Sequence, residues 1–321
     1  MKAYINRKYG PPEVLNLEEV ATPVPKDDEI LVEVHALSLN PAEWHIMSGE
    51  IWVVRLANGL FAPRQQLLGA DIAGVVQSVG KNVEHFRMGD RVFGRSFSGG
   101  LSEYACVKED QLAKIPEGVS FEQAAATPLA SVTALYALRD KGQIKAGEKV
   151  LINGASGGIG TFAVQLADQF GAEVTGVCSG GNADLVKSLG ALEVVDYTQT
   201  DFTEREEQYD LIIELVGNRT ATDMNRVLRP GGRCVMVGFT HFGLLLRFIA
   251  KGAWLSKTTG KQFVSMDAPT RRADLEFVME QIAAGRIAPV VDQVYGFDDL
   301  PEAMAYLGTR RAKGKIVVKV R

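Results

Sequence analysis

The sequence predicts an α/β fold in which a domain with a doubly wound parallel sheet is inserted into a β-rich domain. Three observations lead to this prediction. Short strand patterns separated by turn residues fill the chain from Met1 to about Glu117. From about Phe121 onward, apolar strands alternate with amphipathic helices, which is typical of a parallel sheet covered on both faces. A glycine-rich turn at 153–160 joins the first of these strands to a helix, as in dinucleotide-binding proteins.

The N-terminal region contains several short strands. Runs at 29–36, 71–80 and 90–94 have strand composition, and turn residues such as Gly80 and Gly89 separate them. The first six residues lack the apolar core of a signal peptide and are expected to form a strand as well. We therefore expect a compact β-rich domain here.

The region after Phe121 changes to a helical period and then alternates. An Ala-rich helix is expected over 122–141, broken by Pro128. Beyond it, the pattern predicts strands at 149–153, 173–178, 193–197, 209–216 and 233–238, and helices at 159–170, 183–189 and 221–228. This alternation predicts a doubly wound parallel sheet.

The C-terminal segment is predicted to return to the first domain. It contains a helix over 271–284 and a final strand over 315–320. That strand needs a partner, which the N-terminal strands can supply. We therefore expect one domain made of residues 1–121 and 268–321, and a dinucleotide-binding domain made of residues 122–267.

Composition and charge exclude several classes of protein. The 321 residues are 46% hydrophobic and 23% charged, the usual balance for a soluble globular protein. A net charge of −4 argues against a protein that binds nucleic acid through phosphate contacts. The most apolar stretch, 242–254, is interrupted by Arg247 and Lys251, so no membrane span is expected. The three cysteines are far apart, and a cytoplasmic protein without disulfides is predicted.

The turn at 153–160 is the strongest local motif. Glycines at 154, 157 and 160 would let the backbone approach a pyrophosphate, whose charge then lies at a helix N-terminus. A glycine cluster alone is a weak signal. Because a strand precedes it, a helix follows it and a second strand comes at the right distance, we predict dinucleotide binding.

The loop after the second strand bears on the choice of dinucleotide. An acidic residue that reads the ribose of NADH is expected about 20 residues beyond the glycine turn, but Ser179 stands there. Ser179 and Asn182 can accept a 2′-phosphate, with Tyr197 and Lys313 as further contributors, although the loop itself carries no Arg or Lys. NADPH is therefore expected, and NADH stays possible.

Eight segments, spread over nearly the whole chain, match one family. They are 38–44, 68–74, 80–83, 86–92, 150–167, the turn at Gly217, 228–233 and 312–315. Together they resemble the medium-chain dehydrogenases/reductases, and most closely their zinc-independent quinone oxidoreductase branch, which includes zeta-crystallin-like proteins. The resemblance implies a Rossmann domain inserted in a GroES-like catalytic domain. It also implies NADPH-dependent hydride transfer to quinones or α,β-unsaturated carbonyls.

Zinc-dependent members of that superfamily carry Cys, His-Glu and a further Cys or His at the catalytic metal, plus a four-Cys lobe. Here Asn40 stands at the first ligand position, and only residues 95–100 stand where the lobe would be. The four histidines show no ligand spacing. No metal site is therefore expected.

The resemblance also implies site residues. Asn40 is similar to the family's active-site Asn and is expected to hydrogen-bond the acceptor oxygen or an ordered water, unless it only caps a turn before Pro41. Thr133 corresponds to a Thr that contacts the nicotinamide. No residue stands out as a proton donor, so solvent is the expected source. The expected cofactor-binding residues are Thr133, Ser156, Gly157, Gly158, Ile159, Ser179, Asn182, Tyr197, Gly217, Gly238, Phe239, Thr240 and Lys313.

An apolar substrate pocket is expected between the domains. Its expected residues, which alternatively only pack the core, are Trp44, Trp52, Phe61, Phe242 and Trp254. Substrate preference is expected to be encoded in 51–66. The apolar stretch 242–259, with Arg247, Lys251 and Lys257 at its rim, is expected to be a mobile lid.

Relatives in this family often pair through a strand that follows such a lid. Residues 261–266 match it, so a homodimer is expected. Two other functions stay open, a zinc-free alcohol or aldehyde oxidoreductase and a non-catalytic NADPH-binding redox sensor. Some relatives bind RNA, but the negative net charge gives that little support here.

Overall fold

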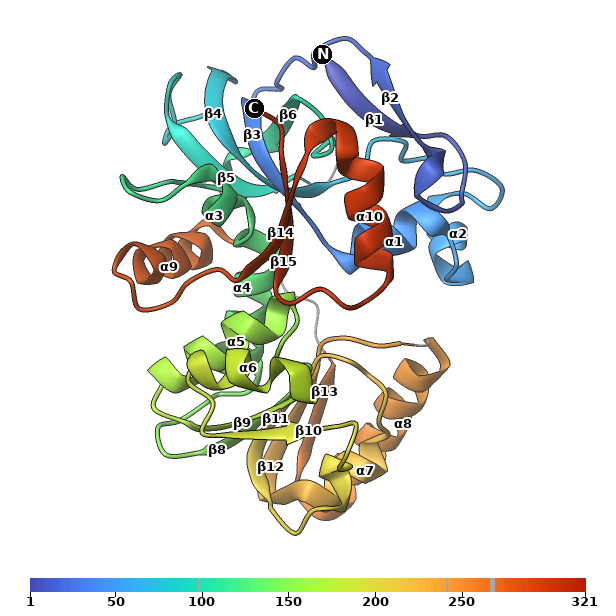
Figure 1. Cartoon of the computed structure of the whole chain (residues 1–321), viewed down its shortest axis with the longest axis vertical. Helices are drawn as coiled ribbons and strands as arrows, with labels where there is room; N and C mark the ends of the chain where they lie inside the picture. Colours follow the sequence, from blue (N-terminus) through green and yellow to red (C-terminus); the bar gives the residue numbers. More distant parts are fainter. Residues whose placement is uncertain (97–98, 241, 266–268) are drawn as a thin grey trace. The chain divides into compact units, whose positions relative to one another are not determined.

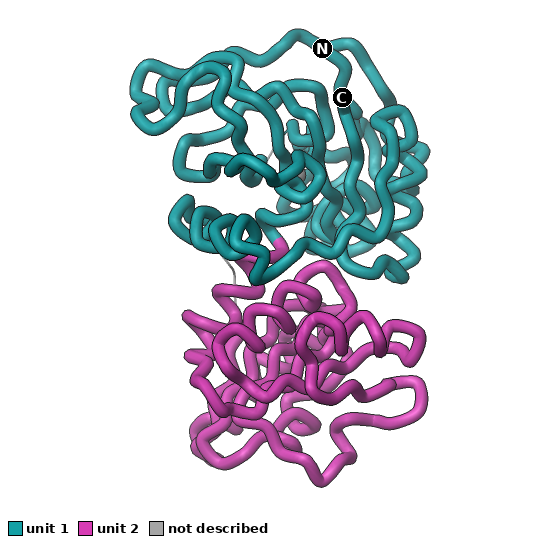
Figure 2. Tube along the Cα trace, turned by 60° about the vertical axis from the view of Figure 1, so that its left-hand side comes forward, with its two compact units in different colours: residues 1–129, 270–321 teal, residues 130–269 magenta. Residues whose placement is uncertain are grey.

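The computed structural model of the chain describes residues 1–96, 99–240, 242–265 and 269–321. His241, Met266 at the end of the expected pairing strand, and the expected domain boundary at 267/268 lie outside the described residues. Contacts within the chain divide it into two compact units (Figure 2). Unit 1 comprises residues 1–129 and 270–321, and unit 2 comprises residues 130–269.

Unit 1 is organised around a seven-stranded sheet (Figure 1). Its strands run in the order β14 (Val291–Gly296), β15 (Lys315–Lys319), β3 (Glu29–Leu39), β4 (Ala70–Val79), β5 (Arg91–Ser96) and β7 (Leu112–Lys114), and β6 (Tyr104–Lys108) also pairs with β3. A separate antiparallel pair is formed by β1 (Lys2–Asn6) and β2 (Leu15–Glu19). Because β15 pairs antiparallel with β3, the last strand joins the N-terminal sheet, as the sequence predicted.

Six helices accompany the strands of unit 1. They are α1 (Pro41–Ser48), α2 (Trp52–Asn58), α3 (Phe121–Ala125), α4 (Pro128–Leu135, which continues into unit 2), α9 (Arg272–Ala283) and α10 (Leu300–Gly308). The helix expected over 122–141 is divided between α3, α4 and a π-helical turn at 136–141. The break comes before Pro128, whose ring cannot continue the preceding helix. Strand β14 and helices α1, α2 and α10 were not anticipated from the pattern.

Unit 2 contains the predicted parallel sheet. Its six strands run in the order β10 (Glu193–Asp196), β9 (Glu173–Cys178), β8 (Lys149–Asn153), β11 (Tyr209–Glu214), β12 (Leu228–Met236) and β13 (Gln262–Ser265), and every neighbouring pair is parallel. The chain moves outward from β8 first in one direction and then in the other. The strand order therefore reverses between β8 and β11, where ligands bind in sheets of this kind.

The helices of unit 2 follow the predicted alternation. They are α5 (Gly158–Gln169), α6 (Ala183–Ser188), α7 (Ala221–Val227) and α8 (Phe242–Thr259). Helix α8 packs on α7 and on β13, and buries Phe248 and Leu255 in a core shared with β11 and β12. No helix in the described parts of the chain is both long and apolar enough to cross a bilayer. The predicted mixed α/β fold is confirmed.

Candidate cofactor and substrate site

The glycine turn lies between β8 and α5. Gly154 has φ = +89°, a conformation that side chains with a Cβ rarely adopt. A Cβ on Gly160 would lie 2.1 Å from the Gly154 carbonyl oxygen, so the first turn of α5 packs directly on the loop. Because α5 begins at Gly158, its unpaired N–H groups and positive dipole end lie at this loop. This arrangement fits a pyrophosphate.

The loop after β9 lies beside the glycine turn. The Asn182 side chain donates from Nδ2 to Ser156 Oγ over 3.1 Å. The Tyr197 N–H donates to the Cys178 carbonyl over 3.1 Å, and 57% of Tyr197 is exposed. The structure thus brings Ser156, Ser179, Asn182 and Tyr197 together at the carboxyl ends of neighbouring parallel strands.

A carboxylate that the sequence analysis did not consider also lies at this loop. Asp196 accepts hydrogen bonds from the Thr198 N–H and hydroxyl, and from the Gly180 N–H, which together hold its pKa below the usual range. A Cβ on Gly180 would lie 2.5 Å from Asp196 Oδ2. Asp196 is the penultimate residue of the predicted strand 193–197, directly before Tyr197, and this position was the available signal.

A second unanticipated carboxylate stands where the strand order reverses. Glu214 ends β11, is fully buried, and receives hydrogen bonds from Asn153 Nδ2 at 2.9 Å to each of its oxygens. The N–H groups of Val216 and Gly217 donate to Glu214 Oε1 over 2.9 and 2.7 Å. Burial raises the pKa of Glu214, and these hydrogen bonds oppose the rise. Glu214 therefore fixes the turn that leads into Gly217.

Gly217 and the segment after β12 are in direct contact. Gly217 has φ = +70°, and a Cβ there would lie 2.3 Å from the Phe239 Cα. The Thr240 hydroxyl donates to the Gly217 carbonyl over 3.1 Å. Four expected cofactor residues, Gly217 and 238–240, are thus brought together. Thr133 is buried on α4, and Lys313 belongs to unit 1, where its N–H donates to Asp292 over 3.0 Å.

In unit 1, Asn40 joins a buried polar cluster. Its amide oxygen accepts from Lys315 Nζ at 2.5 Å, and its Nδ2 donates to Asp71 Oδ2 at 3.3 Å. Lys315 also donates to the Leu39 carbonyl at 3.1 Å and lies 3.5 Å from Asp71 Oδ2. Asn40, Asp71 and Lys315 are at most 3% exposed. Asn40 was predicted as a site residue from the sequence, but neither of its charged partners was.

Glu43 completes this cluster at the start of α1. Asn40 is the N-cap, and its N–H donates to Glu43 Oε2 over 2.8 Å while its carbonyl accepts the Glu43 N–H. Burial, followed by repulsion from Asp71, raises the pKa of Glu43 to about 8, although Lys315 and the backbone hydrogen bonds act in the opposite direction. Glu43 is therefore protonated at neutral pH. Asn40 caps α1, as the alternative interpretation of this residue expected, and it also joins the buried polar cluster.

The donor set at Asn40 does not fit zinc. Within the described ranges, no three His, Cys, Asp or Glu side chains are grouped so that they could hold a metal ion. The oxygens of Leu39, Asn40 and Asp71 instead surround the Lys315 ammonium. A fixed cation already occupies the place where these oxygens converge, and an amide with one carboxylate falls short of the three or four Cys, His, Asp or Glu ligands that zinc takes.

The five aromatic residues expected at a substrate pocket have different environments. Trp44 is partly buried and packs against Gly308 of α10 within the core of unit 1. Trp52 and Phe61 are 62% and 91% exposed near α2. Phe242 begins α8, and Trp254 on the same helix is 54% exposed with Lys251 Nζ 3.8 Å from its ring centre.

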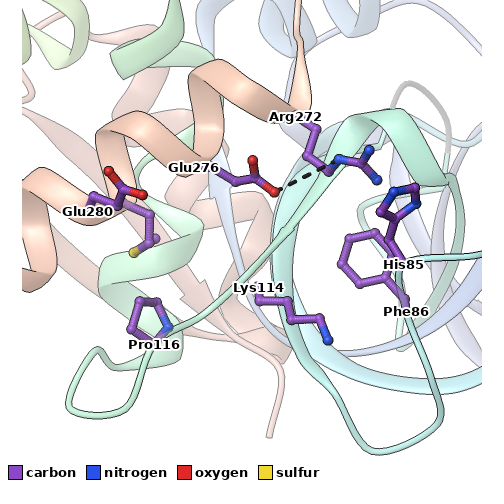
Figure 3. A pocket seen from close by; sticks show the side chains of 8 residues that line it. His85, Phe86, Lys114, Pro116, Arg272, Glu276 and Glu280 are labelled. Atoms are coloured by element: carbon purple, nitrogen blue, oxygen red, sulfur yellow. Dashed lines mark ion pairs between the residues drawn. The ribbon is translucent and has the colours of Figure 1, made fainter.

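A hollow of about 370 Å³ lies in unit 1 beside α9 and β7 (Figure 3). Its lining residues are His85, Phe86, Lys114, Pro116, Arg272, Glu276, Met279 and Glu280. Three of its side chains lie near carboxylates: His85 near Glu109, Lys114 near Asp90, and Arg272 near Glu276. None of the expected site residues lines this hollow.

Comparison with known proteins places these observations in a family. The family model described as an alcohol dehydrogenase GroES-like domain matches residues 26–117, and the one described as a zinc-binding dehydrogenase matches residues 189–318. A quinone oxidoreductase of Sus scrofa is 34% identical, over 97% of this chain and 95% of that protein. A 2-methylene-furan-3-one reductase of Solanum lycopersicum is 32% identical, over 99% and 79%.

The fold comparison agrees with the sequence comparison. The solved quinone oxidoreductase of Escherichia coli, in complex with NADPH, superposes on this chain with a TM-score of 0.87 and is 28% identical in sequence. The superposition covers 100% of both chains.

Proposed function

The chain belongs to the quinone oxidoreductase family of the medium-chain dehydrogenases/reductases and is an NAD(P)H-dependent oxidoreductase, and from this we propose that it transfers hydride from NADPH to quinones or α,β-unsaturated carbonyls without zinc. The observation that carries the zinc-free part of this proposal is the Lys315 ammonium among the oxygens of Leu39, Asn40 and Asp71. Conjugated acceptors suit such a site because they spread the developing negative charge without a Lewis acid.

The cofactor is proposed to bind in unit 2. When bound, the nicotinamide supplies a hydride. The N–H groups at 157–159 would bind the pyrophosphate, and Gly217 with 238–240 would line the path of the dinucleotide. Thr133 would contact the nicotinamide, and Lys313 would come from the other unit. The contacts between Gly217 and Phe239, and between Asn182 and Ser156, support this assignment because they hold the expected segments together.

NADPH is proposed as the preferred cofactor. Ser179 stands where an acidic ribose-reading residue is common, and Tyr197 offers an exposed hydroxyl beside it. Asp196 works against a 2′-phosphate, but it is already engaged by Thr198 and Gly180. The preference therefore depends on hydroxyl and amide donors, and NADH is expected to work more slowly.

Asn40 is proposed to bind the acceptor oxygen. One hydrogen of its Nδ2 is directed to Asp71, and the second is left for the acceptor. Hydride addition delivers two electrons, and one proton from solvent then completes a hydroquinone or a saturated carbonyl. The exposed aromatic residues Trp52, Phe61 and Trp254, together with the partly buried Trp44 and Phe242, are proposed to contact apolar acceptors, and α8 is proposed to act as a lid. A cytoplasmic homodimer paired through 261–266 is proposed as the active form.

The test is a metal-free assay. Protein treated with chelator is mixed with NADPH or NADH and with quinones, enones and simple aldehydes, and absorbance is followed at 340 nm. We expect chelator-resistant oxidation with quinones or enones, at a higher kcat/KM with NADPH. Oxidation only with simple alcohol or aldehyde pairs would replace the proposal with an alcohol oxidoreductase. Tight NADPH binding with no turnover would replace it with a sensor.

A further inference from the structure

Helix α8 has an unusual charge composition. Its 18 residues include Arg247, Lys251 and Lys257 but no Asp or Glu. The chain as a whole has a net charge of −4, so this helix is a local cationic segment in an acidic protein. The acidic residue of the neighbouring helix α7, Asp223, is paired with Arg226 and with Thr220.

The helix has two apolar faces. One, with Phe248, Gly252 and Leu255, is buried against unit 2. The opposite face exposes Leu246, Ile249 and Trp254, which are 52%, 44% and 54% accessible. These residues follow the i, i+3 and i+8 spacing of a single helical stripe. Packing in the unit 2 core accounts for the apolar residues of the first face, whereas those of the second face are exposed.

Cations border the exposed stripe. Arg247 and Lys251 lie one turn apart beside it, and Lys257 lies at its C-terminal end; all three are exposed. The Lys251 ammonium lies 3.8 Å from the Trp254 ring centre. An apolar stripe that ends in Trp and is flanked by cations, on a helix without acidic residues, is the pattern of a helix that lies in a membrane interface, where apolar side chains enter the acyl region and cations meet anionic headgroups.

We propose that α8 docks this protein on the surface of an anionic lipid bilayer, with Leu246, Ile249 and Trp254 inserted and Arg247, Lys251 and Lys257 at the headgroups. Charge complementarity favours an anionic bilayer over a second copy of this chain, whose own α8 would bring like charges together. The helix lies on the bilayer and does not cross it. The inference goes beyond the proposed function and does not depend on it, because docking requires neither cofactor nor acceptor. In the docked state Trp254 contacts lipid in place of the acceptor contact proposed above.

The first experiment is sedimentation of the 321-residue chain with vesicles. Vesicles of phosphatidylcholine alone are compared with vesicles containing about one third phosphatidylglycerol. We expect co-sedimentation with the anionic vesicles only, and release when NaCl is raised from 0.1 to 0.5 M. Equal binding to both kinds of vesicle, or none to either, overturns the proposal.

Variants separate the two components of the interaction. R247Q/K251Q/K257Q is expected to weaken anionic-vesicle binding by about tenfold or more, since each cation near the surface contributes substantially. L246S/I249S is expected to weaken it at constant charge. The matched controls K8Q/K108Q/K145Q and V24S/L192S change exposed residues elsewhere and are expected to bind as the native chain does. Losses of equal size in the controls would overturn the assignment to α8.

A spectroscopic readout tests insertion directly. The W52F variant retains two tryptophans, the partly buried Trp44 and the exposed Trp254. Anionic vesicles of brominated lipid are expected to quench the fluorescence of Trp254 in this variant, while Trp44 supplies a constant background. The opposite outcome is that the native chain does not bind vesicles and that L246S/I249S changes the oligomeric state in the absence of lipid. In that case a second copy of the chain covers the stripe, and the lipid proposal fails.

Discussion

At the scale of single residues, the orientation of the Asn40 amide is the central feature. An amide has two nearly isosteric ends, and its function depends on which end faces which neighbour. Here the Lys315 ammonium faces the oxygen and the Asp71 carboxylate faces the nitrogen. Two opposite charges therefore select one orientation, in which Nδ2 can donate to an acceptor. Lys315 thus acts as a positioning residue for Asn40 in the proposed reaction.

The variant Lys315→Met tests this coupling. It is expected to lower kcat at least tenfold with little change in the KM for NADPH, because Asn40 loses the partner that fixes its amide. In an Asn40→Ala background the same change is expected to have little further effect on kcat. Steady-state kinetics of the two single variants and the double variant provide the comparison.

Lys319→Met, on the same strand and more exposed, is the control. Since Lys315→Met leaves Asp71 without its ammonium, K315M/D71N is measured beside it in case the single variant unfolds. If the effects of Lys315→Met and Asn40→Ala simply multiply, Lys315 does not act through Asn40.

Glu43 is expected to make stability depend on pH. Its pKa is raised from 4.5 to about 8 in the folded protein, so the folded state keeps a proton that the unfolded chain has released. The stabilising contribution is complete below about pH 4.5 and is lost as pH rises toward 8, at up to about 1.4 kcal/mol per pH unit. Glu43→Gln is expected to remove this slope, as measured by urea unfolding between pH 5 and 8. Parallel stability profiles for the native protein and Glu43→Gln would contradict the assignment.

At the scale of elements, the β8–loop–α5 unit depends on close backbone approach. Gly160 lies on the first turn of α5, and a Cβ there would meet the Gly154 carbonyl at 2.1 Å. A carbonyl oxygen of the main chain cannot move aside as a side chain can. The loop and the helix therefore have to separate if any side chain is introduced, which would displace the N–H groups that are proposed to bind the pyrophosphate.

Gly160→Ala is accordingly expected to raise the Kd for NADPH more than tenfold, as measured by fluorescence titration or calorimetry. Gly243→Ala on α8 is the control, because a Cβ at Gly243 would meet nothing within 4 Å. Unchanged NADPH affinity in a folded Gly160→Ala protein would show that the glycine turn does not hold the cofactor.

At the scale of the whole molecule, strand β13 forms one edge of the unit 2 sheet. It pairs with β12 on one side and is last in the strand order. An edge strand presents unpaired N–H and carbonyl groups that favour pairing with another strand. Antiparallel pairing of β13 with its copy around a two-fold axis would continue the sheet from one protomer into the next.

The homodimer has a direct test. Light scattering of the native protein at micromolar concentration is expected to give twice the monomer mass. Q262K/S265K places lysines near their copies across the two-fold axis and is expected to give a monomer through like-charge repulsion. A native monomer would rule out the dimer, and a dimeric Q262K/S265K protein would place the interface elsewhere.

The nucleotide domain could be predicted from the sequence because its signals are local. The apolar strand at 149–153, the glycine turn and the helix that follows are adjacent in the chain, and each has a recognisable period. Asp196 and Glu214 were missed although they lie near the carboxyl ends of the predicted strands 193–197 and 209–216, and they end the observed strands β10 and β11. The strand pattern places their backbone, but it does not reveal that their carboxylates turn back onto Gly180 and Asn153.

Period, turn chemistry and motif spacing are properties of consecutive residues, so the parallel sheet, the glycine turn and the family could be predicted from the amino-acid sequence alone. Only the tertiary structure decided what surrounds Asn40. Asp71 and Lys315 are 31 and 275 residues away from it, and they meet it because β3 pairs with β4 on one side and with β15 on the other. Strand register in a sheet sets which distant residues face one another, and that register depends on the packing of the whole domain.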